Sequence, residues 1–157
     1  MKSSFLKIAV IINCDDEFGK GILLKLLEEG FFVYGINKTP VFEKLKNYRD
    51  IVFNSSQNYD IREAFERIPV ISVVLVNHKN HEDYLVLENL NENLEKGLEH
   101  VFVIKPDEYP DKETFRAKIR ETVINLSSKE IKPEDLGEVV LSCLKLPNTV
   151  FVKNMCI

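Results

Sequence analysis

Cysteine is scarce in this chain of 157 residues. Cys14, Cys143 and Cys156 make an odd count and form no CxxC pair, which argues against a disulfide framework and against a cysteine-ligated metal. We therefore expect buried or incidental free thiols in a reducing, cytoplasmic protein. The alternative is an exposed and reactive thiol at Cys14, which follows an apolar run at a strand end.

Histidine is equally scarce, with three residues in the chain. His78 and His81 lie near Glu82 and Asp83, a grouping that could suggest a metal site. No cysteine lies close to them in the sequence, and a solvated helix start explains the pattern better. We predict no metal site.

Blocks of basic residues and long apolar runs are also absent. The net charge is −4 and the pI is about 5.5, so nucleic acid is not expected as a partner. No apolar run reaches the roughly 20 residues that span a membrane. The N-terminal run KIAVII is followed at once by Asn13, Asp15 and Asp16, which indicates a buried strand rather than a signal peptide.

What the sequence does have is a regular alternation of short β-rich runs and helical patterns. With 45% hydrophobic residues, residues 1–157 can form one domain with a substantial core. The predicted strands are Lys7–Ile12, Phe31–Ile36, Asp50–Phe53, Val70–Val76, His100–Ile104, Thr122–Leu126 and Thr149–Met155. The predicted helices are Gly19–Glu29, Val41–Asn47, Asp60–Arg67, His81–Leu98, Asp111–Glu121 and Pro133–Lys145.

This alternation predicts an α/β fold, a three-layer doubly wound parallel sheet with helices on both faces. The runs IAVII and ISVVLV are continuously apolar, as central parallel strands are. In such sheets a ligand binds beyond the carboxyl ends of the strands, near the turn after the first strand.

The segment PEDLGEVVLSCLKLPNTVFVKNMCI combines a helix and a short strand. Pro133 and two acidic residues favour a helix start, Pro147 ends the helix, and Val150 and Val152 alternate in a strand. This layout resembles the C-terminal signature of the short-chain dehydrogenase/reductase family. The resemblance implies a Rossmann-like sheet with strand order 3-2-1-4-5-6-7.

The turn after the first strand resembles the TGxxxGxG cofactor loop of that family, with three of four positions altered. Ile12, Asn13, Glu17 and Gly19 stand at the Thr and the three Gly positions. Asn13 tolerates a left-handed backbone. Glu17, with Asp15 and Asp16, brings carboxylates to the place where a pyrophosphate would lie, and Lys20 alone offsets them.

The catalytic landmarks of the family are altered as well. VLVNHKN resembles the VLVNNAG motif and keeps Asn77. Lys105-Pro106 stands where two serines are expected, and Tyr109 and Lys112 lack the YxxxK spacing. Ser127-Ser128 replaces a Pro-Gly pair. Without the Tyr/Lys pair, the family's reduction of carbonyls has no proton donor.

We therefore expect a degenerate, non-catalytic relative, a pseudoenzyme that needs no cofactor and acts through self-association or through a related catalytic subunit. The helix at 81–98 and the strand at Val150–Met155 match the family's oligomer contacts. The alternative is an NAD(P)-dependent oxidoreductase with an unusual site. Its cofactor-binding residues would be Asn13, Asp15, Glu17, Phe18, Gly19, Lys38 and Asn77.

A second alternative is a receiver domain of the response-regulator type. Asp15 and Asp16 resemble its metal-binding acids and Lys105-Pro106 its Lys-Pro motif, although Asn54 replaces the phospho-accepting Asp. This interpretation predicts a five-stranded sheet of order 2-1-3-4-5. The strand order therefore distinguishes it from the first two.

Overall fold

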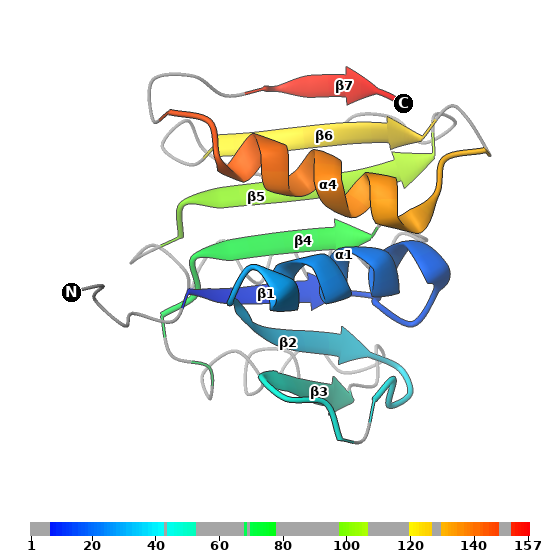
Figure 1. The fold of residues 1–157 in the computed structure, drawn as a ribbon, viewed down its shortest axis with the longest axis vertical. Helices are drawn as coiled ribbons and strands as arrows, with labels where there is room; N and C mark the ends of the chain where they lie inside the picture. Colours follow the sequence, from blue (N-terminus) through cyan, green and yellow to red (C-terminus); the bar gives the residue numbers. More distant parts are fainter. Residues whose placement is uncertain are drawn as a thin grey trace.

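The computed structural model describes residues 7–42, 44–52, 68, 70–77, 98–106, 120–126, 130–147 and 152–157. One parallel sheet of seven strands has the order β3-β2-β1-β4-β5-β6-β7 (Figure 1). This is the predicted order, and it excludes the receiver topology. The strands are β1 (Ile8–Ile12), β2 (Phe32–Asn37), β3 (Tyr48–Val52), β4 (Val73–Asn77), β5 (His100–Pro106), β6 (Arg120–Leu126) and β7 (Asn154–Cys156).

The central strands are buried on both faces, as their continuous apolar sequence predicts. Along β1, Ala9 and Ile11 belong to one core cluster, and Val10 and Ile12 belong to the other. Successive side chains of a strand point to opposite faces. The sheet therefore has two apolar layers, and most of its buried polar residues lie at or near the ends of the strands.

Helix α1 (Glu17–Glu28) begins two residues before the predicted start, because Asp16 caps it. The Asp16 side chain accepts a hydrogen bond from the backbone N–H of Gly19, the geometry of an N-cap. At the other end Gly30 has φ +95°. Phe31 N donates to Leu26 O at 3.0 Å, which completes a Schellman-type end and confirms the predicted cap.

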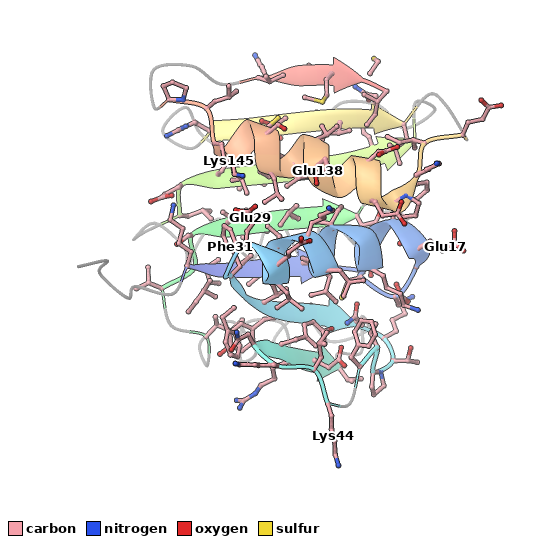
Figure 2. All side chains as sticks on the ribbon, viewed as in Figure 1. Glu17, Glu29, Phe31, Lys44, Glu138 and Lys145 are labelled. Carbon is pink, nitrogen blue, oxygen red and sulfur yellow. The ribbon has the colours of Figure 1, made fainter. Side chains whose placement is uncertain are left out.

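Helix α4 (Pro133–Leu144) lies beside α1 on one face of the sheet (Figure 1). Its start at Pro133 is the predicted one. Lys25 Nζ of α1 lies 2.7 Å from Glu138 Oε1 of α4. Lys145 Nζ donates to Glu29 Oε1 at 3.3 Å, and Figure 2 shows both residues at the same end of the helix pair.

Several predicted boundaries are wrong. Residues 41–42 and 44–47 form bends and turns instead of a helix, and β3 begins at Tyr48, before the predicted Asp50. Arg120 and Glu121 belong to β6 rather than to a preceding helix, and β7 begins only at Asn154. The predicted helix Asp60–Arg67, residues 81–97 of the predicted helix His81–Leu98, and residues 111–119 lie outside the described residues.

Within the described ranges, no helix is both long and apolar enough to cross a membrane.

Candidate functional site

The carboxyl ends of β1 and β4 are joined by a reciprocal pair of amide contacts. Asn13 Nδ2 donates to Asn77 O at 3.1 Å, and Asn77 Nδ2 donates to Asn13 O at 3.0 Å. Asn13 has φ 67°, the left-handed conformation expected from the sequence. The two asparagines therefore fix the turn at the point where a Rossmann sheet holds its ligand.

Asp16 ties this turn to the first helix. Its Oδ1 accepts from Gly19 N at 2.7 Å and from Asn77 Nδ2 at 2.9 Å. A Cβ at Gly19 would lie 2.4 Å from Cys14 Cα, so only glycine lets the helix approach the turn this closely. A carboxylate of the chain itself thus occupies a helix N-terminus that could otherwise accept an anion.

Two more carboxylates flank the capped turn. Asp15 and Glu17 are exposed, and Glu17 lies at the start of α1 in Figure 2. Phe18 is half-buried and packs against the core, and Lys20 is exposed. An anion placed at this turn would meet these like charges, and the Gly19 N–H is already bonded to Asp16.

A second polar cluster, which we call the Asp50 cluster, lies at the ends of β2 and β3. It consists of Asn37, Tyr48 and Asp50, together with Cys14 from the turn after β1. Asn37 Oδ1 accepts from Cys14 N at 2.8 Å. Asn37 Nδ2 donates to Asp50 Oδ1 at 3.0 Å, and the Tyr48 hydroxyl donates to the same oxygen.

Asp50 also organises the loop that follows β2. Its Oδ2 accepts from Val41 N at 2.9 Å and from Phe42 N at 3.0 Å. The Phe42 ring meets the Tyr48 ring edge-on, with centroids 6.0 Å apart. The prediction of a helix at 41–47 is therefore wrong, because the bonds from Val41 N and Phe42 N to Asp50 hold a loop there.

Cys14 is fully buried, as expected of the thiols in general, and the alternative of an exposed, reactive thiol at this position is wrong. Its Sγ lies 3.3 Å from the Tyr48 hydroxyl, and burial raises the pKa of the thiol. Burial and the hydrogen bond to Asp50 also raise the pKa of Tyr48. Both groups stay protonated at neutral pH and are structural.

Two further residues singled out in the sequence lie along the same edge. Lys38 is exposed just after β2, whereas Lys105 is buried at the end of β5. Tyr109, Lys112, Ser127 and Ser128 lie outside the described residues, as do His78 and His81. Among the residues that the structure describes, no group of three or more His, Cys, Asp or Glu could hold a metal.

The sequence predicts one site that contains Asn13, Asp15, Glu17, Gly19 and Asn77. It does not predict the Asp50 cluster. One signal was available. Tyr48 and Asp50 alternate with the strand period of two, which would have placed an acidic residue on the inner side of β3.

No family model matches this chain, and no curated protein matches it. Solved structures share its fold. Serine dehydrogenase from Escherichia coli has a TM-score of 0.71 at 15% identity, covering 96% of each chain. A short-chain dehydrogenase/reductase from Vibrio parahaemolyticus has a TM-score of 0.73 at 12% identity, over 95% of this chain and 98% of the other.

A metagenomic short-chain oxidoreductase in complex with NADP has a TM-score of 0.67 at 12% identity, over 99% of this chain and 98% of the other. At these identities the likeness shows the fold alone. This fold is the Rossmann-like sheet of short-chain dehydrogenase structures, over nearly the whole length.

Proposed function

We propose that this protein is a catalytically silent relative of the short-chain dehydrogenases that acts in the cytoplasm, by self-association or by binding a related catalytic subunit. The observation that carries the proposal is the contact of Asp16 with Gly19 N and Asn77 Nδ2. The chain supplies its own anion to the helix end that a cofactor pyrophosphate would need.

The residue that would bind the adenosine end of a dinucleotide already makes hydrogen bonds within the chain. The ribose of such a cofactor is bound by a residue at the end of the second strand. Here that residue is Asn37, which is fully buried. Its Oδ1 accepts from Cys14 N, and its Nδ2 donates to Tyr48 and Asp50.

The reaction end lacks the family's chemistry. Strand β5 ends in Lys105-Pro106, where the resemblance leads us to expect a catalytic serine. The sequence contains no YxxxK motif after that strand. The chain therefore has neither a serine hydroxyl at the end of β5 nor a tyrosine followed four positions later by a lysine. The proton donor that the family uses is missing.

Strand β7 gives the protein an edge for association. It pairs with β6 and ends the sheet, and an edge strand presents unpaired backbone groups to a partner. Lys153, Asn154 and Cys156 are exposed. Val152 packs against the core, so substitution there would damage the fold, and Val150 lies outside the described residues.

The first experiment is calorimetry of NADPH and NADH, with and without Mg²⁺. We expect no binding by the native chain up to millimolar cofactor. The double variant Asp15→Ser/Glu17→Gly and the single variant Asp16→Ser, which keeps a capping hydroxyl, test whether charge is the barrier. Tight binding by the native chain would reject the proposal.

Association is tested separately by light scattering. We expect a mass above that of one chain, and we expect Cys156→Asp on the β7 edge to lower it. Leu24→Asp is the matched control, because Leu24 is also an exposed apolar residue but lies on α1. Loss of association in both variants, or in neither, would contradict a β7 interface.

A second candidate is an NAD(P)-dependent oxidoreductase. The observation that favours it is the retained backbone of the turn, with Asn13 left-handed and Gly19 packed on Cys14. Lys38 is exposed after β2, where a basic residue favours a 2′-phosphate. Turnover with a panel of carbonyl substrates would support this function, and inertness after confirmed cofactor binding would remove it.

A further inference from the structure

Strand β3 forms the margin of the sheet opposite to β7 (Figure 1). It pairs with β2, and Val33 N donates to Asn47 O at 2.9 Å. In a parallel ladder the backbone groups of every second residue point to the same side of the strand. Asn47 and every second residue after it therefore face β2. The N–H and C=O groups of Tyr48, Asp50 and Val52 face away from the sheet.

Most of these outward groups lack a hydrogen-bond partner. Tyr48 N donates to Leu45 O at 3.3 Å. Across the part of the chain that the structure describes, the Tyr48 carbonyl and the backbone groups of Asp50 and Val52 make no hydrogen bond on this side. A row of unpaired groups along an edge strand is a template for a further strand.

Three exposed cations lie at the same margin. Lys44 and Lys46 are in the loop that leads into β3, and Arg49 is on the strand. None of the described residues forms an ion pair with any of the three. Figure 2 shows the Lys44 side chain pointing away from the protein. These charges are available to a partner.

The margin differs in charge from the protein as a whole. Residues 38–52 contain four basic and two acidic side chains, whereas the net charge of the chain is −4. Of the two acids, Glu43 lies outside the described residues. The Asp50 carboxylate accepts hydrogen bonds from Val41 N and Phe42 N within the fold. A basic margin on an acidic protein favours a partner of negative charge.

We propose that the β3 edge docks an extended acidic segment of a partner protein, which adds a strand to the sheet. Its backbone would bond to Tyr48 O and to the outward groups of Asp50 and Val52. A peptide fits this edge better than a nucleic acid or a lipid headgroup, because only a peptide supplies alternating N–H and C=O groups. The inference goes beyond the proposed function, since β7 lies at the other edge of the sheet.

The two faces of β3 indicate the sequence pattern of the partner. Val52 is 53% exposed and shares a face with Tyr48 and Asp50, whereas the Arg49 side chain lies on the other face. Side chains on neighbouring strands that share a face contact each other. A segment in which acidic and β-branched residues alternate would bring its acids toward Arg49 and its apolar side toward Val52.

The probe is a short fluorescein-labelled peptide in which glutamate and valine alternate, and binding is followed by fluorescence anisotropy. We expect it to bind the native chain, and we expect no binding when lysine replaces each glutamate. Lys44→Glu/Lys46→Glu should weaken binding about tenfold or more. The matched control is Lys132→Glu/Lys153→Glu, which reverses two exposed charges near α4 and β7 and should bind as the native chain does.

Two proline substitutions test the backbone contacts. Val52→Pro removes an N–H group that faces away from β2, and an edge strand tolerates proline at such a position. It should abolish binding, whereas Val52→Thr keeps the N–H group and should bind. A peptide with proline in place of each valine keeps its charge but forms no strand, so it should not bind. This peptide keeps the test decisive if Val52→Pro does not fold.

Three results would overturn the proposal. The first is binding of the proline peptide, or binding of the valine peptide to a folded Val52→Pro variant, because charge alone would then explain the affinity. The second is an equal loss of affinity in the two double-lysine variants. The third is a lower mass of Val52→Pro than of the native chain in light scattering, because a second copy of this chain would then occupy the edge.

Discussion

The hydroxyl of Tyr48 lies in the space that a side chain at Gly35 would fill. A Cβ on Gly35 would be 2.2 Å from this oxygen and 2.6 Å from Cys14 Sγ. The glycine in β2 thus makes room for the hydrogen bonds that join β3 to the turn after β1.

Gly35→Ala should therefore destabilise the protein. The added methyl group must displace the Tyr48 hydroxyl or the Cys14 thiol from a buried cluster. We expect the free energy of unfolding to fall by about 2 kcal/mol, measured by urea denaturation. Tyr48→Phe removes the obstructing oxygen, so Gly35→Ala should cost less in that background. Equal costs in both backgrounds would show that the contact is not the cause.

Asn77→Asp should be more harmful than its small change in shape suggests. The amide nitrogen donates to Asn13 O and to Asp16 Oδ1. An aspartate oxygen cannot donate there and adds a negative charge beside Asp16. We expect a loss of about 3 kcal/mol in the free energy of unfolding at pH 7.

The matched control for this substitution is Asn154→Asp. Asn154 accepts a hydrogen bond from Asn125 through its oxygen, and an aspartate keeps that oxygen. It should leave stability nearly unchanged. A comparable loss in both variants would mean that the new charge, rather than the lost donor, is responsible.

One thiol in three should react in the native protein. Cys14 and Cys143 are buried, whereas Cys156 is exposed. Burial also raises the pKa of Cys14 and of Cys143, which lowers their thiolate fraction further. Titration with a chromogenic disulfide should give one fast equivalent, none in Cys156→Ser, and three for the native chain in denaturant. A second fast equivalent would contradict the buried position of Cys14.

The protein should lose stability in alkali. The pKa of Cys14 is raised above 9.0 in the fold, so above about pH 9 the unfolded chain releases a proton that the folded chain keeps. The free energy of unfolding then falls as the pH rises, by about 1.4 kcal/mol per unit for each such group. Tyr48 adds a second group above pH 10.0.

Urea denaturation at pH 8, 9 and 10 measures this slope. Cys14→Ala, which has no thiol to titrate at that position, should give a shallower slope than the native chain. Equal slopes would show that the thiol of Cys14 does not contribute.

The sequence predicts the two described helices from local signals, whereas the strand order follows from the resemblance to short-chain dehydrogenases. Gly30 ends α1, Pro133 begins α4, and the apolar runs of β1 and β4 need cover on both faces. These features agree with the resemblance to dehydrogenases. The turn at Asn13 also follows from a local signal, because few residues other than glycine and asparagine tolerate a left-handed backbone.

The errors come from contacts between residues that are distant in the sequence. The pattern at 41–47 fits a helix, but the carboxylate of Asp50 takes the N–H groups of Val41 and Phe42 and holds a loop instead. The side-chain partner of Cys14 is Tyr48, which is 34 positions away. Local propensity contains no information on either contact, because both depend on how β3 lies against β2.

The pairing of α1 with α4 has a consequence for synthesis of the chain. Lys145 and Glu29 are 116 positions apart, and in space they close one end of the same helix pair. A chain that leaves the ribosome from its amino end completes α1 long before α4 exists to pack against it. The side of α1 that faces α4 includes Gly21 and Lys25. It must wait for the last quarter of the sequence to be made, so docking of α4 is a late step in folding.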